Sequence, residues 1–202
     1  MKIAVIGASG NVGSRLSAEA LSRGHQVTGI ARHADKIAPR PGLTAVAADA
    51  ADIAALARAL RGHDVAISST RFNGNDPHAT INAAKQGGVK RLLVVGGAGS
   101  LNAGGTRLVD SPQFPAAYKP EALAGAGWLE ALRQEKELDW TFLSPSAFFL
   151  PGERTGKFRL GKDDLLVGAD GKSSISIEDY AIAMFDEIER PRHSRQRFTV
   201  GY

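Results

Sequence analysis

The stretch Gly7-Ala8-Ser9-Gly10-Asn11-Val12-Gly13 joins an apolar run to a segment with helical periodicity. Residues 1–6 (MKIAVI) are typical of a short buried parallel strand. In residues 11–23, apolar side chains recur at helical spacing, and Gly24 would end this helix as a C-terminal cap. A glycine-rich turn that opens a helix exposes backbone N–H groups, which attract anions together with the helix dipole. The stretch therefore predicts a binding site for the diphosphate of a dinucleotide.

At each of the three glycine positions of this turn, a different structural need explains why the residue has no side chain. Gly7 allows the tight bend, Gly10 lets the backbone approach a pyrophosphate, and Gly13 lets the helix pack closely on the sheet. The spacing G-x-x-G-x-x-G is one residue longer than the G-x-G-x-x-G form of the dinucleotide fingerprint. The alternative is a glycine-rich turn that binds no ligand. The strand–turn–helix context favours the dinucleotide.

Strands and helices alternate along the rest of the chain. Further strands are predicted at residues 26–31, 43–48, 64–69, 89–95, 140–143 and 197–202, and further helices at residues 52–60, 77–86, 118–134 and 177–188. This alternation indicates βαβ units and a parallel sheet with its ligand crevice at the carboxyl ends of the strands. We predict an α/β fold: a Rossmann-like, doubly wound parallel sheet with helices on both faces, in a single domain of residues 1–202. Residues 150–180 are expected to form a small C-terminal, substrate-side lid or hairpin.

The residues after the second strand bear on the choice between NAD and NADP. An acidic residue at this strand end would bind the ribose 2′-hydroxyl, whereas an arginine suits a 2′-phosphate. Arg32 stands there, followed by His33, Lys36 and Arg40, and Asp35 lies three residues beyond Arg32. A guanidinium can hold a phosphate with two hydrogen bonds. The sequence therefore favours NADP, with an ordinary surface arginine as the alternative.

Two aspartates follow the third strand. Asp49 ends that strand and could accept a hydrogen bond from the adenine amino group. Asp52 precedes an alanine- and leucine-rich helix and is expected to cap it. Either carboxylate could be a plain helix cap, so both assignments are hypotheses.

The composition excludes several classes of site. The chain has 202 residues, is 43% hydrophobic and 23% charged, and contains no cysteine, which excludes disulfides, thiolate metal sites and a cysteine nucleophile. The five histidines show no ligand spacing, so no metal site is predicted. No apolar run approaches the roughly 18 residues that span a bilayer, and the N-terminal run is too short for a signal peptide. We expect a cytoplasmic protein without a membrane partner.

Basic residues slightly outnumber acidic ones, for a formal net charge of +4. They are scattered among the acidic residues, and the densest group is interpreted as a solvated tail because no aromatic side chains are interleaved as stacking platforms. No nucleic-acid partner is expected, although a few basic residues are expected to serve an anionic small molecule. This densest group consists of Arg190, Arg192, His193, Arg195 and Arg197.

Several segments together resemble the atypical short-chain dehydrogenase/reductase superfamily. They are the glycine turn GASGNVG, Asp49, residues 93–99 (LVVGGAG), 140–146 (WTFLSPS), 151–161 (PGERTGKFRLG) and 175–181 (ISIEDYA). The last three are similar to small bacterial proteins named NADH-flavin reductases, which are related to NmrA-like proteins and to biliverdin-IXβ/flavin reductase. The resemblance covers nearly the whole chain.

This resemblance implies a role for particular residues. The pyrophosphate would be lined by Gly7, Ser9, Gly10, Asn11, Val12 and Gly13. Arg32 would meet the 2′-phosphate, and Asp49 with Ala50 would border adenine. The cofactor ribose would pass Ser68, Ser69 and Thr70. The nicotinamide would lie over the residues from Gly96 and Gly97 to Gly99, with its carboxamide flanked by Ser144, Pro145 and Ser146.

The chain departs from the superfamily at the proton relay. The wider superfamily uses a serine after the fifth strand and a Tyr-x-x-x-Lys motif, in which the tyrosine delivers a proton. Here the first serine after that strand is Ser100, and Tyr118 is followed at the fourth position by Ala122, with Lys119 adjacent to it. Ser100 and Tyr118 are kept as candidate catalytic contacts. We expect direct hydride transfer from NADPH to a flavin, quinone or similar planar acceptor, which needs little help with a proton.

Two other functions stay open. A non-catalytic, NADP-sensing regulator of the NmrA type would bind the nucleotide without turnover. A sugar-nucleotide epimerase-like enzyme is disfavoured by the missing tyrosine–lysine pair. For the reductase, aromatic side chains could stack on the acceptor, although such residues are more often core. The candidates are Phe148, Phe149, Phe158 and Trp128, of which the first two are the best placed. A monomer or a homodimer is expected.

Overall fold

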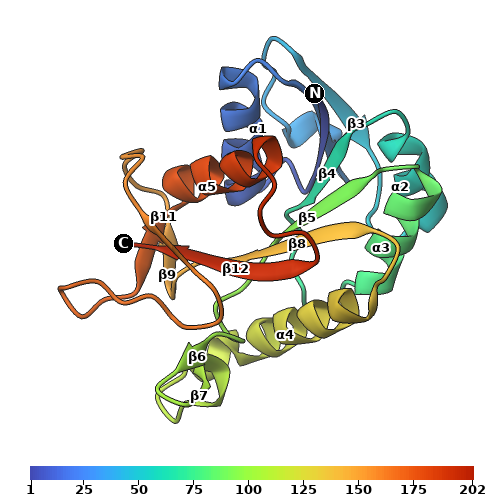
Figure 1. Ribbon diagram of the computed structural model, residues 1–202. Helices are drawn as coiled ribbons and strands as arrows, with labels where there is room; N and C mark the ends of the chain where they lie inside the picture. The colour runs from blue at the N-terminus through green and yellow to red at the C-terminus, as the bar shows by residue number, and fades with distance from the viewer.

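A computed structural model describes residues 1–202, and its centre is an eight-stranded sheet (Figure 1). The strand order is β10-β12-β8-β5-β4-β1-β2-β3. All neighbours are parallel except β10, which runs antiparallel to β12 at the edge. This confirms the predicted doubly wound sheet. The strands are β1 (Lys2–Ile6), β2 (Gln26–Ala31), β3 (Leu43–Ala47), β4 (Val65–Ser68), β5 (Arg91–Val95), β8 (Asp139–Ser144), β10 (Arg159–Gly161) and β12 (Gln196–Gly201).

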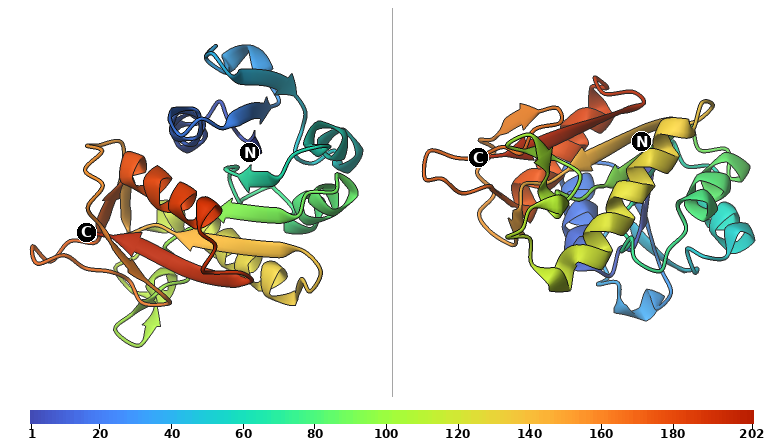
Figure 2. Two further views of the ribbon diagram at one scale, coloured as in Figure 1. Left: turned by 45° about the horizontal axis from the view of Figure 1, so that its top comes forward. Right: turned by 90° about the horizontal axis from the view of Figure 1, so that it is seen from below.

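Helices cover both faces of this sheet, as predicted (Figures 1 and 2). One face carries α1 (Asn11–Ser22) and α5 (Ile177–Glu189), and the other carries α2 (Ile53–Leu60), α3 (Pro77–Gln86) and α4 (Lys119–Gln134). Side chains alternate along β1, so that Ile3 and Val5 join the cluster under α1 and α5, while Ala4 and Ile6 join the opposite one. Burial on both faces explains why the strands are continuous apolar runs.

Most predicted elements lie within a few residues of the observed ones, and β2 and α3 match in full. The predicted strand 89–95 begins only at Arg91, because the Val89 N–H still bonds to the Ala84 carbonyl at the end of α3. The predicted helix 52–60 begins at Ile53. Asp52 is its N-cap, with its carboxylate 2.9 Å from the Ala55 nitrogen, which confirms the capping assignment.

Several short elements carry no periodic signal and were not predicted. Hairpin β6 (Asn102–Ala103) and β7 (Thr106–Arg107) follows β5, and β9 (Phe148–Leu150) pairs in parallel with β11 (Ser174–Ser176). Three single 3₁₀ turns are η1 (Ala34–Lys36), η2 (Leu108–Asp110) and η3 (Ala116–Tyr118). Strands of two or three residues are too short for alternation to be detected.

Residues 151–157, at the start of the predicted lid region, are hydrogen-bonded to both helices of one face. The Gly152 N–H donates to the Glu178 carboxylate of α5 at 2.8 Å. The Arg154 guanidinium donates to the buried Glu19 carboxylate of α1 at 2.9 Å. In this structure the segment therefore lies across the α1–α5 pair, and the edge strand β10 that follows it pairs with β12.

The interpretation of the basic group as a solvated tail is wrong in part. Arg197 lies on β12, inside the sheet, and only 4% of its side chain is exposed. His193 is half-buried, and its Nδ1 lies 2.7 Å from the Glu187 carboxylate. The other three arginines of the group are exposed, as expected. The basic pattern in the sequence does not reveal that the final strand, which carries Arg197, lies inside the sheet between β8 and β10. No helix of the chain has the length and apolar character needed to span a membrane.

Candidate nucleotide-binding site

A crevice of about 500 Å³ opens at the carboxyl ends of β1, β2, β3 and β4. The strand order reverses between β1 and β4, and ligands of open α/β sheets bind at such a switch point. The crevice is lined by eight of the predicted cofactor residues: Gly7, Ser9, Gly10, Arg32, Asp49, Ala50, Ser69 and Thr70. The sequence-predicted phosphate and adenine residues are thus brought together from four separate loops.

The glycine turn is compact for reasons that differ from residue to residue. Gly7 has a φ of +84°, and a Cβ there would overlap the Ser69 carbonyl oxygen. A Cβ on Gly13 would overlap the Gly7 carbonyl oxygen. A Cβ on Gly10 would come no closer than 3.3 Å to that oxygen, a tight but tolerable contact. Packing therefore requires Gly7 and Gly13, whereas it would tolerate a Cβ on Gly10.

The N-terminus of α1 is open to an anion. Gly10 is its N-cap residue and offers no side chain to bond the first N–H groups of the helix. Its backbone N–H is itself taken by the Gly7 carbonyl at 3.0 Å, which fixes the turn. The remaining free N–H groups and the helix dipole form the kind of site that holds a phosphate.

Two exposed guanidinium groups border the crevice, from Arg32 after β2 and Arg71 after β4. Neither side chain forms an ion pair or a hydrogen bond with another residue. Asp49 borders the same crevice from the loop after β3, and its carboxylate accepts the Ala51 N–H at 3.0 Å. The crevice thus combines free positive charge with one oriented carboxylate, an arrangement suited to a phosphorylated nucleoside.

The loop after β4 supplies crevice residues that sequence reasoning missed. They are Arg71, Asn73, Gly74 and Asn75. The loop is held by the carboxylate of Glu121 on α4, which accepts the N–H groups of Phe72 and Asn73 at 2.7 and 2.9 Å. A usable signal was present, because a polar stretch with glycine directly follows the strand that ends at the switch point.

The glycines predicted under the nicotinamide lie outside this crevice, after β5. A Cβ on Gly96 would lie 2.5 Å from the Phe142 ring, and one on Gly99 would lie 2.7 Å from the Ala122 Cβ. Both positions are therefore too crowded for a serine. Gly97, between them, has more room, because a Cβ there would come no closer than 3.6 Å to the Phe72 ring.

Ser144, Pro145 and Ser146 are buried and lie outside the crevice as well. The Ser144 hydroxyl accepts from Arg197 at 3.4 Å, and the Ser146 hydroxyl donates to the Val200 carbonyl at 3.0 Å. Both side chains thus turn toward β12. Four further predicted residues do not line the crevice: Asn11, Val12, Gly13 and Ser68.

The candidate catalytic residues sit in different surroundings. Tyr118, at the start of α4, is 68% exposed, and its hydroxyl has no hydrogen bond. Ser100 is half-buried, and its hydroxyl lies 3.3 Å from the Arg197 guanidinium. No hydrogen bond joins these two residues. The buried Tyr180 donates to the Leu143 carbonyl at 2.7 Å, and burial raises the pKa of this phenol well above its ordinary value.

Among the aromatic candidates for acceptor stacking, only Phe148 presents a free ring, at 59% exposure. Phe149 packs on Tyr180 with ring centroids 4.6 Å apart, and Trp128 is fully buried. Phe158 belongs to a separate pocket. Phe149 and Trp128 are therefore part of the core, and Phe148 begins β9, four residues after the end of β8.

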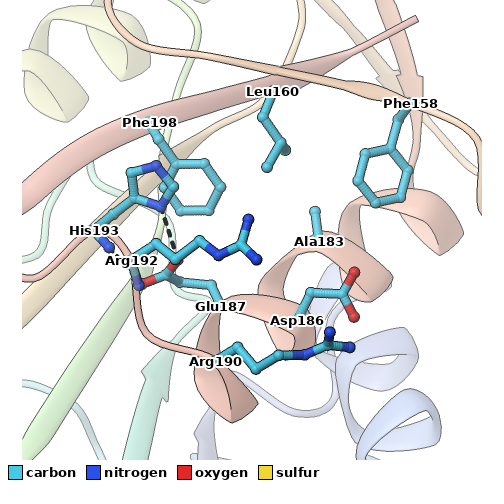
Figure 3. Close-up of a pocket in the computed structure, with 9 residues that line it drawn as sticks. All are labelled: Phe158, Leu160, Ala183, Asp186, Glu187, Arg190, Arg192, His193 and Phe198. Atoms are coloured by element: carbon cyan, nitrogen blue, oxygen red, sulfur yellow. Dashed lines mark hydrogen bonds and ion pairs between the residues drawn. The ribbon is translucent and has the colours of Figure 1, made fainter.

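That separate pocket, of about 130 Å³, lies between α5 and the strands β10 and β12 (Figure 3). It shares no residue with the nucleotide crevice. The buried Glu187 carboxylate bonds to His193 and to the Arg91 guanidinium. Burial alone would raise the pKa of Glu187, but these hydrogen bonds and two backbone N–H groups hold that pKa below its ordinary value. The carboxylate is fully satisfied and has a structural role.

Comparison with known proteins agrees with this geometry. A sequence profile described as NAD(P)H-binding matches residues 7–191. YwnB of Bacillus subtilis is 43% identical over 212 aligned positions, which cover 99% of this chain and 98% of that protein. A proposed epimerase from Bacteroides thetaiotaomicron has a TM-score of 0.94 and 45% identity, covering 100% of this chain and 96% of its own.

Two further solved structures cover 100% of this chain. A Burkholderia pseudomallei protein proposed to be exported has a TM-score of 0.90, 46% identity and 100% coverage of its own chain. A proposed NADH-flavin reductase from Streptococcus pneumoniae has a TM-score of 0.85, 36% identity and 99% coverage of its own chain. The resemblance inferred from the sequence is confirmed, and with a profile match that spans most of its length the chain belongs to the NAD(P)H-binding family.

Proposed function

We propose that this protein is an NADPH-dependent reductase of a flavin, a quinone or a similar planar acceptor. The observation that carries the proposal is the crevice at the switch point, which is lined both by an open helix N-terminus and by two unpaired guanidinium groups. Its residues fit a phosphorylated dinucleotide, because Gly10 puts no side chain at the N-terminus of α1, where a phosphate would lie. The bound cofactor would supply a hydride.

The preference for NADPH rests on Arg32 and Arg71. Arg32 follows β2, where a residue that recognises the 2′-position of the adenosine ribose is expected. Arg71 reaches the same crevice from the loop after β4. Two guanidinium groups without carboxylate partners favour a cofactor with the extra phosphate, since each is free to bond to it.

The choice of acceptor rests on what surrounds the end of β8. Phe148 offers an exposed ring for stacking, as a planar acceptor requires. The tyrosine hydroxyls support a reaction without a tyrosine–lysine relay, because Tyr180 is buried and bonded to a carbonyl and Tyr202 bonds to Asp179 at 2.8 Å. A conjugated acceptor spreads the incoming charge over its own rings, so alignment is the main task of the protein.

This chain is similar both to a proposed epimerase and to a proposed NADH-flavin reductase, so these two activities have to be compared. An epimerase of this fold class would need a proton donor near the nicotinamide, and the exposed Tyr118 without a bonded partner makes a poor one. A sensor of the NmrA type would use the same crevice without turnover.

The cysteine-free composition is compatible with action in the reducing cytoplasm, which we propose as its location.

Steady-state oxidation of NADPH with a panel of acceptors tests the proposal. Absorbance at the reduced nicotinamide band would be followed with FMN, FAD, a benzoquinone and an aliphatic ketone. We expect turnover with at least one planar acceptor and none with the ketone. Tight NADPH binding without turnover on any acceptor would support the sensor instead, and turnover with the ketone alone would exclude the planar acceptor.

A further inference from the structure

Arg197 is a buried cation at the end of the sheet where the nicotinamide would lie. Its side chain is 4% exposed, although charged side chains are rarely buried without partners. It projects from β12 opposite the face that carries Phe198, toward the loop after β5 and the end of β8. Neither the nucleotide crevice nor the pocket under α5 includes it.

The guanidinium joins three chain segments. Its Nε and Nη2 donate to the Asp163 carboxylate, at 2.8 and 2.5 Å. Its Nη1 lies 3.3 Å from the Ser100 hydroxyl and 3.4 Å from the Ser144 hydroxyl. The segment of Asp163 is fixed to β6 in turn, because the Asn102 N–H donates to the Asp163 carbonyl at 2.8 Å. Figure 1 shows the β6–β7 hairpin next to this orange segment.

The direction of these bonds decides what the serine hydroxyls can do. A guanidinium donates and never accepts, so each serine oxygen accepts from Arg197 and keeps its own proton. Neither hydroxyl donates to any other group of the protein. Ser144 is fully buried, whereas Ser100 is half-buried and follows the glycines at the carboxyl end of β5. Ser100 is thus the hydroxyl with a proton free to reach a ligand.

We propose that Arg197 is a positioning residue that holds Ser100 as a hydrogen-bond donor to the nicotinamide carboxamide of the bound cofactor. The bonds of 3.3 and 3.4 Å are long, and such contacts commonly shorten when a ligand binds. The buried cation reaches the site from the last strand, β12. The inference rests on the proposed cofactor and leaves the identity of the acceptor open.

Binding measurements test this inference without any turnover. NADPH would be compared with adenosine 2′,5′-bisphosphate, which lacks the nicotinamide half, by isothermal titration calorimetry. We expect Ser100→Ala and Arg197→Met each to weaken NADPH binding about fivefold, the loss of one hydrogen bond, and to leave the bisphosphate unchanged. The double variant should be no weaker than Ser100→Ala alone, because Arg197 acts through Ser100. Arg197→Lys should restore part of the affinity.

Arg192→Met is the matched control, since the Arg192 side chain is exposed and unpaired and precedes the same strand, while its backbone N–H, which bonds to Glu187, is kept in the variant. It should change neither affinity. Equal losses of affinity for NADPH and the bisphosphate, or additive losses of NADPH affinity in the double variant, would show that Arg197 has only a structural role. If Arg197→Met melts far below the wild type, Ser100→Ala and Arg197→Lys carry the same comparison. Absence of turnover in the wild type would contradict the reductase proposal alone.

Discussion

Gly13 is packed so closely against Gly7 that a Cβ on Gly13 would overlap the Gly7 carbonyl oxygen. This contact seats the first turn of α1 on the end of β1. We expect Gly13→Ala to destabilise the fold by about 1–3 kcal/mol, the typical cost of forcing an atom into a packed region, and to abolish nucleotide binding. Urea unfolding and NADPH titration would measure the two effects.

Gly10→Ala is the informative partner of that variant. Its Cβ meets only a contact of 3.3 Å within the protein, so stability should change by less than about 1 kcal/mol. It would nevertheless occupy the space that a pyrophosphate needs, and NADPH affinity should fall at least about tenfold. Intact affinity in Gly10→Ala would mean that the phosphate does not lie over this turn.

Cofactor choice should depend on Arg32 and Arg71. Replacing Arg32 with alanine should weaken NADPH binding by about 1.5–3 kcal/mol, as for a lost charged hydrogen bond, and leave NADH binding nearly unchanged. Arg71→Ala should show the same selectivity if its guanidinium also meets the 2′-phosphate. Arg58→Ala, on α2 away from the crevice, is the control. Equal loss of both cofactors would place the guanidinium groups on the pyrophosphate instead.

The fold could be predicted from the sequence because its signals are local. Apolar runs ending at glycine mark β1 and β5, and helical spacing with caps marks α1 and α3. Asp49 and Arg32 could be assigned to one crevice from their places at strand ends, because parallel strands end at the same edge. No long-range information was needed for these steps.

The nicotinamide end could not be predicted in the same way. The role of Arg197 depends on β12 lying beside β8, a pairing between segments about 55 residues apart that no local pattern reveals. The sequence places Arg197 in a basic group and Ser144 in an apparent carboxamide loop, yet the two bond to each other. Phe148 and Phe149 are adjacent and equally aromatic, and only the pleat of β9 decides which is exposed.

Phe148 and Phe149 offer a test of acceptor stacking. Phe148→Ala removes a ring that is 59% exposed, so stability should change little while the KM for the acceptor rises about tenfold, with NADPH affinity unchanged. Phe149→Ala removes the ring packed on Tyr180 and should instead cost about 2–4 kcal/mol of stability. Unfolding and acceptor kinetics on both variants separate the two roles. An unchanged KM in Phe148→Ala would remove this ring from the acceptor site.

Glu121 should control the loop that borders the crevice. Glu121→Gln keeps the side-chain shape but loses the charge that holds the Phe72 and Asn73 N–H groups, so we expect a loss of about 1–2 kcal/mol in stability and weaker NADPH binding. Glu130→Gln is the control on the same helix, where the carboxylate is exposed and pairs only with Arg133. Hydrogen exchange of the 70–75 loop would report the loosening. Equal protection of that loop in both variants would contradict it.

The pairing of Glu187 with Arg91 and His193 predicts a pH-dependent contribution to stability. The pKa of Glu187 is lowered in the folded protein, against the effect of burial, by hydrogen bonds from His193, Arg192 and Arg91. A carboxyl group with a depressed folded pKa stabilises the fold fully above its unfolded pKa of about 4.5. Below that pH the unfolded chain takes up the proton first, so this stabilisation is lost as pH falls through the folded pKa.

Glu187→Gln tests the prediction that the stabilisation by Glu187 is lost as the pH falls. At pH 7 the variant leaves the buried Arg91 with the Asp139 carboxylate alone, 3.3 Å from its Nε, so the free energy of unfolding should drop by about 3 kcal/mol. Below pH 4.5 the wild type loses the same stabilisation, and the difference between the two proteins should narrow. Glu137→Gln, at a side chain that is 76% exposed, should differ little from the wild type at either pH. Urea unfolding at pH 7 and pH 3.5 makes the comparison, and a gap of constant size would show that the Glu187 charge is not what holds α5 to the base of the sheet.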